Sequence, residues 1–186
     1  MTPTETVVER HADLIDVVRE STLQTINTML NLEVECGAVH AGQRVTIPSS
    51  GIIAMVGLAG AVGGNGCLFM SKKLACLFTS KFLMADYTEV NDEVMDVSAE
   101  LCNMIIGGLK TALEEKKGPM GLSVPTVVFA DNYFTRSANI GERFVVEFIT
   151  GEGDYREAFY VQVCIIDDPR SMTYLKQLAD FHARLI

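Results

Sequence analysis

The sequence predicts an α+β fold in which helices pack on an antiparallel sheet. Several segments carry apolar residues at three- and four-residue spacing, which is typical of amphipathic helices. Two other regions hold paired apolar or alternating segments around glycine-rich turns, which is typical of strand hairpins. The chain has 186 residues, 48% of them hydrophobic, so we expect one domain spanning 1–186 with an ample buried core.

Each element is predicted from its own pattern of apolar and polar residues. The predicted elements are, in order, a helix at 13–32, a strand at 33–39, a hairpin at 45–70, a helix from 71 to 85, a helix at 92–117, a strand at 124–132, a hairpin that joins 143–149 to 158–166, and a helix at 169–186.

The ends of these elements are indicated by capping and turn residues. Ser71 and either Asn91 or Asp92 have the side chains that N-cap helices. Gly118, followed by a proline, marks the end of the long helix. Within the first hairpin, the run Gly63-Gly64-Asn65-Gly66 predicts the turn between its two strands.

Charge and cysteine content narrow the classes of function. The formal net charge is −9 and no run of Lys or Arg exceeds two, which argues against nucleic acid and anionic membrane surfaces as partners. A protein whose contact face carries lysines fits better. The five cysteines are scattered without metal-site spacing, so we expect reduced thiols, no metal site and a cytoplasmic location.

One uncharged stretch raises the question of a membrane span. Residues 45–71 contain no charged side chain, but they include Pro48 and six glycines, and the strongest apolar block, 52–62, is too short to cross a bilayer. The first ten residues are polar and do not resemble a signal peptide. We therefore expect buried strands here and no membrane partner.

The long helix at 92–117 holds the candidate functional residues. At about 100° per residue, Val94, Val97, Leu101, Met104, Ile105, Leu109 and Ala112 form its apolar face. The opposite face carries Asp96, Glu100, Asn103, Gly107, Lys110 and Glu114. Residues three apart are neighbours on a helix, so the carboxylate of Glu100 and the carboxamide of Asn103 can act on one small target.

Two interpretations of this face stay open from the residues alone. A pair such as Glu100 and Asn103 is often an ordinary solvated surface, and Gly107 and Gly108 can relieve crowding against a neighbouring element. Each glycine costs a helix about 1 kcal/mol relative to alanine. Gly107 lies on the polar side, where a bare backbone would let a partner approach closely.

The helix and its surroundings resemble a known family. The Glu100-x-x-Asn103 motif with Gly107, the glycine-rich hairpin before it, the helix from Ser71 and the strand entry at 123–127 are similar to the CheX-like members of the CheC/CheX/FliY family. The resemblance covers about residues 10–166, leaving 169–186 as a C-terminal helical extension. It implies a pseudo-symmetric fold and a homodimer formed through sheet edges.

The resemblance also implies an activity, a partner and roles for residues. It implies a phosphatase for the phosphorylated receiver domain of a response regulator, which is CheY in chemotaxis, a form of two-component signalling. Glu100 and Asn103 would be catalytic, and Asp96 and Gly107 would bind the partner. The protein would have no cofactor of its own, because Mg²⁺ would come from the receiver.

Two alternatives from other classes remain. One is a non-catalytic module of the same fold that binds a receiver or mediates assembly. The other is a small-ligand domain, which requires an apolar pocket away from Glu100. The sequence shows no cluster of polar residues that would line such a pocket, so we expect no polar-lined pocket away from Glu100.

Overall fold

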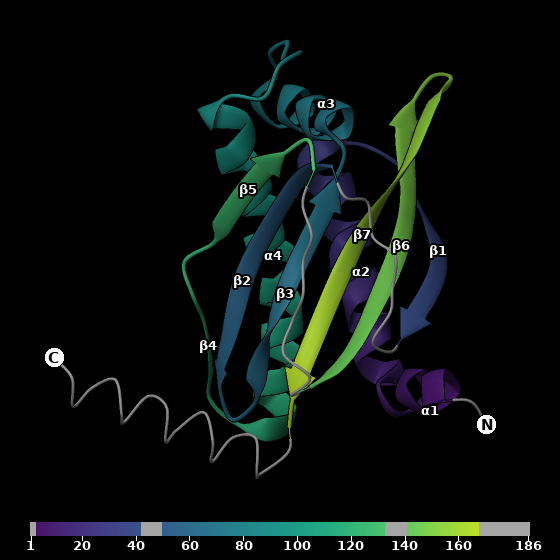
Figure 1. Ribbon diagram of the computed structural model, residues 1–186, viewed down its shortest axis with the longest axis vertical. Coiled ribbons are helices and arrows are strands. Elements are labelled where there is room, and N and C mark those ends of the chain that lie inside the picture. Colours follow the sequence, from purple (N-terminus) through teal and green to yellow (C-terminus); the bar gives the residue numbers. More distant parts are fainter. Residues whose placement is uncertain (1–2, 42–49, 133–140, 168–186) are drawn as a thin grey trace, which may run out of the picture.

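The structure is a computed structural model that describes residues 3–41, 50–132 and 141–167. Two long helices, α2 (Ala12–Leu30) and α4 (Asp92–Lys117), lie side by side on one face of a seven-stranded antiparallel sheet (Figure 1). The shorter helix α3 (Lys72–Leu83) covers one end of this layer, and α1 (Pro3–Arg10) lies near the other end. The predicted fold class is confirmed. Within the described ranges, no helix is both long enough and apolar enough to span a bilayer.

The sheet is built from two halves with the same order of elements. Its strands are β1 (Val34–Ala41), β2 (Gly51–Gly60), β3 (Gly63–Met70), β4 (Met120–Leu122), β5 (Thr126–Ala130), β6 (Glu142–Glu152) and β7 (Tyr155–Ile166). The spatial order is β1-β6-β7-β3-β2-β4, and β5 also pairs with β2. Helix α2 with β1, β2 and β3 therefore repeats as α4 with β5, β6 and β7. The antiparallel β3–β7 pair lies at the centre of this pseudo-symmetric arrangement.

The hydrophobic core fills the space between the two long helices and the sheet. Val18 and Ile26 of α2 and Leu101 of α4 are almost completely buried in it. From the sheet, the rings of Phe148 and Phe159 stack with centroids 5.3 Å apart. This core fixes the rotation of α4, and with it the residues that α4 presents to solvent.

The first hairpin differs from its prediction in one respect. The turn lies at Ala61 and Val62, whereas the glycine run belongs to β3. A Cβ atom on Gly64 would lie 2.0 Å from the Cys164 carbonyl oxygen, and one on Gly66 would lie 2.3 Å from Cδ1 of Ile106. The glycines therefore let β3 approach β7 and α4 closely, and a turn was the wrong interpretation.

Most other elements agree with their predictions, with two additions. Helix α4 has the predicted bounds, and Ser71 and Asn91 cap α3 and α4 as expected. The sequence patterns missed α1 and the three-residue strand β4. The predicted helix at 169–186 lies outside the described residues.

Candidate functional site

Helix α4 begins and ends with strong local signals. The side chain of Asn91 accepts a hydrogen bond from the Val94 amide at 3.0 Å, and Asp92 and Glu93 occupy the first turn. Lys116 and Lys117 lie in the last turn. Acidic residues at the start and basic residues at the end both interact favourably with the helix dipole. The helix therefore forms a stable, long platform for side chains on its solvent side.

The buried side of α4 is broader than the predicted apolar face. Met104 and Ala112, which were expected in that face, are only half-buried, whereas Ser98, Cys102 and Ile106 are buried. The reason is that α4 contacts α2 on one side and β2, β4 and β5 on the other, so the contact area extends around the helix. Ser98 lies in it without cost because its hydroxyl donates to the Val94 carbonyl at 2.7 Å.

The candidate site residues all lie outside the core. Asp96 and Glu100 are exposed, and Asn103 and Gly107 are half-buried. Several other side chains of α4 donate hydrogen bonds, including those of Ser98, Cys102, Lys110 and Thr111. Within the described part of the chain, the head groups of Glu100 and Asn103 have no hydrogen-bond or ion-pair partner. An acid and an amide one turn apart are thus available to a second molecule.

The two neighbouring glycines have different surroundings. A Cβ atom on Gly108 would lie 2.3 Å from Oγ of Ser21, whose hydroxyl donates to the Ile105 carbonyl at 2.9 Å. Relief of crowding against α2 therefore explains Gly108. A Cβ atom on Gly107 would have nothing within 4 Å. Internal packing does not require glycine at 107, so its bare backbone faces open space beside Asn103.

The sequence matches one protein family. A family model described as "Chemotaxis phosphatase CheX" matches residues 52–149, which is more than half of the chain and includes all of α4. The chain belongs to the CheX family. No curated protein matches the sequence at a significant level.

Solved structures show the same fold at low sequence identity. The chemotaxis protein CheX from Vibrio vulnificus superposes with a TM-score of 0.72 at 21% identity, covering 82% of this chain and 99% of that chain. A CheC-like superfamily protein from Shewanella sp. PV-4 gives 0.71 at 23% identity, covering 82% and 97%. The CheX chain of a CheX–CheY–BeF₃–Mg²⁺ complex from Borrelia burgdorferi gives 0.69 at 23% identity, covering 81% and 96%. At this identity the likeness establishes the CheX fold alone.

A polar network further along α4 was not singled out from the sequence. The Lys110 ammonium pairs with Oε2 of Glu114, and Oε1 of Glu114 accepts from the Met120 amide at 3.2 Å. The hydrogen bond from Lys110, and then that from the Met120 amide, lower the pKa of Glu114. The i, i+4 spacing of Lys110 and Glu114 can be read from the sequence. The contact between Glu114 and the Met120 amide cannot, because it depends on how the chain turns from α4 into β4.

Cys102, the cysteine next to Asn103, is not placed to act as a nucleophile. Cys102 precedes Asn103 but points into the core, where its thiol donates to the Ala54 carbonyl at 3.3 Å. Burial raises the pKa of Cys102 to about 12, so the thiolate is scarce at neutral pH. No group of three or more metal-ligating side chains occurs in the described ranges.

A cleft lies at the other end of α4, which the sequence did not predict. It has a volume of about 630 Å³ and is lined by both apolar and charged side chains. Leu14, Val62, Leu113 and Ile165 form its apolar part. The expectation that no polar cluster would line a pocket away from Glu100 is therefore wrong, because charges from four separate elements meet only in the folded chain.

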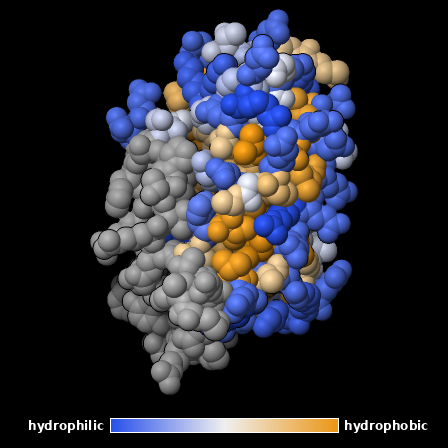
Figure 2. Space-filling model, turned by 90° about the vertical axis from the view of Figure 1, so that its right-hand side faces the viewer, coloured by the Kyte–Doolittle hydropathy of each residue, from blue (hydrophilic) through white to orange (hydrophobic). Residues whose placement is uncertain are grey.

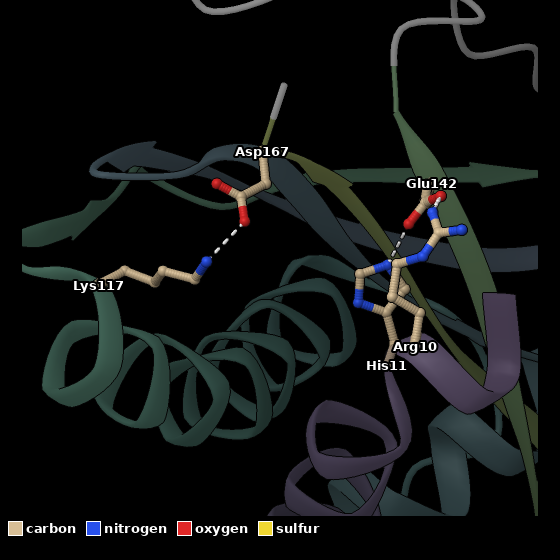
Figure 3. A network of polar contacts seen from close by, with 5 residues as sticks. All are labelled: Arg10, His11, Lys117, Glu142 and Asp167. Carbon is tan, nitrogen blue, oxygen red and sulfur yellow. Dashed lines mark hydrogen bonds and ion pairs between the residues drawn. The ribbon is translucent and has the colours of Figure 1, made fainter. Parts of the chain in front are cut away.

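The charges of this cleft neutralise one another. Arg10 and His11 both contact the Glu142 carboxylate, His11 at 2.6 Å, while Lys117 pairs with Asp167 at 2.8 Å (Figure 3). Burial, and then Arg10, lower the pKa of His11, while Asp167 acts in the opposite direction. The cleft thus presents no excess charge for a ligand, unlike the carboxylate of Glu100.

Proposed function

We propose that the protein accelerates hydrolysis of the phosphoaspartate on a CheY-like receiver domain. The observation that carries this proposal is the solvent-facing Glu100 and Asn103 pair, without partners among the described residues, in a chain of the CheX family. The CheX–CheY complex of Borrelia burgdorferi, with BeF₃ and Mg²⁺, supports a receiver as the partner.

The chemistry needs little from the phosphatase itself. In the reaction, water attacks phosphorus, the bond between phosphorus and the aspartate oxygen breaks, and the aspartate carboxylate leaves. The receiver brings Mg²⁺, a lysine and a hydroxyl residue, which balance the charge of the phosphoryl group. The missing component is a water held in line with the breaking bond, and such positioning contributes much of catalysis in phosphoryl transfer.

Asn103 suits this task. Its carbonyl oxygen accepts a hydrogen bond from the attacking water, its NH₂ group donates to a second acceptor, and the side chain adds no negative charge near the phosphoryl oxygens. Because Asn103 lies on a long capped helix, its position is fixed relative to whatever docks on α4.

Glu100 and two neighbours would dock the receiver. Glu100, one turn before Asn103, pairs with the receiver's active-site lysine and so sets the distance from the amide to phosphorus. Gly107 has open space around it and permits close approach of the partner. Asp96 adds a second exposed carboxylate on the same side of the helix. The chain's net charge of −9 also favours a lysine-bearing contact face.

We also propose a homodimer formed through a sheet edge. Strand β1 is an edge strand, and an apolar area bordered by polar residues lies at the centre of the molecular face that presents β1 and α2 (Figure 2). Cys36 of β1 and Met29 of α2 are exposed, and Val34 and Val39 are half-buried. The test is sedimentation equilibrium: we expect a dimer for the wild-type chain and a monomer for Cys36→Arg. A wild-type monomer contradicts this proposal.

The activity is tested by phosphate release from a phosphorylated receiver. We expect Asn103→Ala to remove the acceleration, by about 100-fold or more, because a preorganised group at the reacting centre is lost. Docking to the beryllofluoride-treated receiver should stay close to that of the wild-type protein. Glu100→Ala should weaken docking as well as hydrolysis.

A matched control is Glu115→Ala, which removes an exposed carboxylate near the far end of the same helix. It should leave both docking and hydrolysis unchanged. If the receiver docks but its phosphoaspartate decays at its own rate, the protein is a non-catalytic binding module. If Asn103→Ala retains wild-type acceleration, the proposed role of the amide is wrong.

A further inference from the structure

The cation of Lys110 lies on the same side of α4 as the candidate site. It follows Asn103 by seven residues, which is two helical turns, or about 10 Å along the axis and about 20° around it. Between them lies Gly107, where a side chain would meet nothing within 4 Å. A partner surface that reaches Asn103 and rests on this bare turn therefore continues over Lys110.

The ammonium group of Lys110 is held in place before any partner arrives. It pairs with the Glu114 carboxylate, which also accepts from the Met120 amide where β4 begins. The Lys110 side chain is only 25% exposed, so its aliphatic part is packed. Fixing a free lysine side chain costs rotamer entropy, and here the fold has already ordered it.

The pair of Lys110 and Glu114 contributes little to the stability of α4. In an i, i+4 pair, a Glu that precedes a Lys stabilises a helix better than the reverse order, and α4 has the reverse order. An exposed or half-exposed pair of this kind contributes little to the free energy of unfolding. The arrangement does, however, place one fixed positive charge beside a surface on which Asp96 and Glu100 are negative.

We propose that Lys110 is a positioning residue that binds a carboxylate on the receiver surface, outside the receiver's active site. The inference rests on the proposed function and deepens it by naming a feature of the substrate. Acidic Glu100 pairs with the receiver lysine, and basic Lys110 pairs with an acid about 15 Å further along the helix. A receiver with both charges at that separation docks in register, and a receiver with a basic residue at the second place is rejected.

The test compares Lys110→Gln with Lys116→Gln in hydrolysis of the phosphorylated receiver. Lys116 is a suitable control because it belongs to the same helix but pairs with Asp13 of α2. We expect Lys110→Gln to raise KM about 5-fold with kcat unchanged, because one partly screened ion pair is lost. Lys110→Glu should raise KM further, and Lys116→Gln should leave KM unchanged.

Two further readouts separate a contact with the receiver from a structural role. The KM of the wild-type protein should rise with salt more steeply than that of Lys110→Gln, because a charge contact is screened. The free energy of unfolding should fall equally in Glu114→Gln and Lys110→Gln, whereas KM should rise mainly in Lys110→Gln.

An unchanged KM in Lys110→Gln, or a fall in kcat alone, overturns the role of Lys110. That result leaves the proposed function intact, provided that the wild-type protein still accelerates hydrolysis and Asn103→Ala does not. If Asn103→Ala accelerates hydrolysis as well as the wild-type protein does, the proposed function itself is overturned.

Discussion

The two ends of α4 use polar residues in different ways. Toward the N-terminal end, Glu100 and Asn103 face solvent and have no hydrogen-bond or ion-pair partner in the described part of the chain. At the C-terminal end, about 20–25 Å away along the axis, Lys117 is paired with Asp167, and the charges that line the neighbouring cleft neutralise one another.

The unpaired groups of α4 are available for binding, whereas the paired groups stabilise the fold. A group whose hydrogen-bonding capacity is filled by internal partners contributes to the fold, but it must lose one of them to bind another molecule. Glu100 and Asn103 need no such exchange, so their interactions are available to a receiver. The charged groups that line the cleft are, in contrast, already paired with one another.

The largest expected effect on stability concerns Gly108, where the fold and not the partner requires glycine. In Gly108→Ala the new Cβ would lie 2.3 Å from Oγ and 2.8 Å from Cβ of Ser21. We expect the free energy of unfolding to fall by about 1–2 kcal/mol, because overpacking outweighs the gain in helix propensity. Urea denaturation measures this change. Adding Ser21→Gly should restore stability, and a failure to do so would show that α2 is not the obstacle.

Gly107→Ala should have the opposite effect on stability. Its new methyl group meets open space, so we expect the free energy of unfolding to rise by about 0.5–1 kcal/mol. Because the methyl group would keep the receiver away from Asn103, docking and hydrolysis should both weaken. Calorimetric titration and phosphate release measure these effects. A more stable protein with full activity would mean that glycine at 107 serves no partner.

Smaller effects are expected at the far end of the helix. Glu142→Gln weakens the contacts with Arg10 and His11, whose side chains are 58% and 11% exposed. We expect a loss of under about 1 kcal/mol in the free energy of unfolding. Phosphate release from the receiver should be unchanged. A fall in hydrolysis without loss of fold would show that the two ends of α4 are coupled.

The smallest effect concerns the pH dependence of stability. Burial and Arg10 lower the pKa of His11 below 6.5, so the unfolded chain takes up its proton first as pH falls. The free energy of unfolding should therefore decrease as pH falls through about 6.5, and less so in His11→Gln. Urea denaturation at several pH values checks this, with exposed His40→Gln as the control. Equal decreases in both variants would exclude His11 as the source.

The helix that carries the candidate site could be predicted from the sequence almost completely. Helix periodicity, an Asn91 cap and Gly118 are local signals, and they define the bounds of α4 without knowledge of its neighbours. The exposure of Glu100 also follows from periodicity. The distinction between Gly107 and Gly108 does not, because it depends on Ser21 of another helix.

Features that depend on distant segments were missed for a physical reason. The glycines of β3 look like a turn until β7 and α4 are placed against them. The cleft gathers Arg10, Lys117, Glu142 and Asp167 from segments that are far apart in the sequence, and no local pattern indicates that they meet. Close packing and ion pairs across the fold are properties of the tertiary structure.

The most direct test of the central claim is phosphate release at saturating protein with Asn103→Asp. This substitution keeps the shape of the side chain but replaces the NH₂ donor by a negative charge close to the phosphoryl oxygens. The carboxylate keeps an oxygen that accepts from the attacking water, but its negative charge repels the phosphoryl oxygens, so the phosphorylated receiver should decay at its own rate. A decay as fast as that with the wild-type protein would contradict the account.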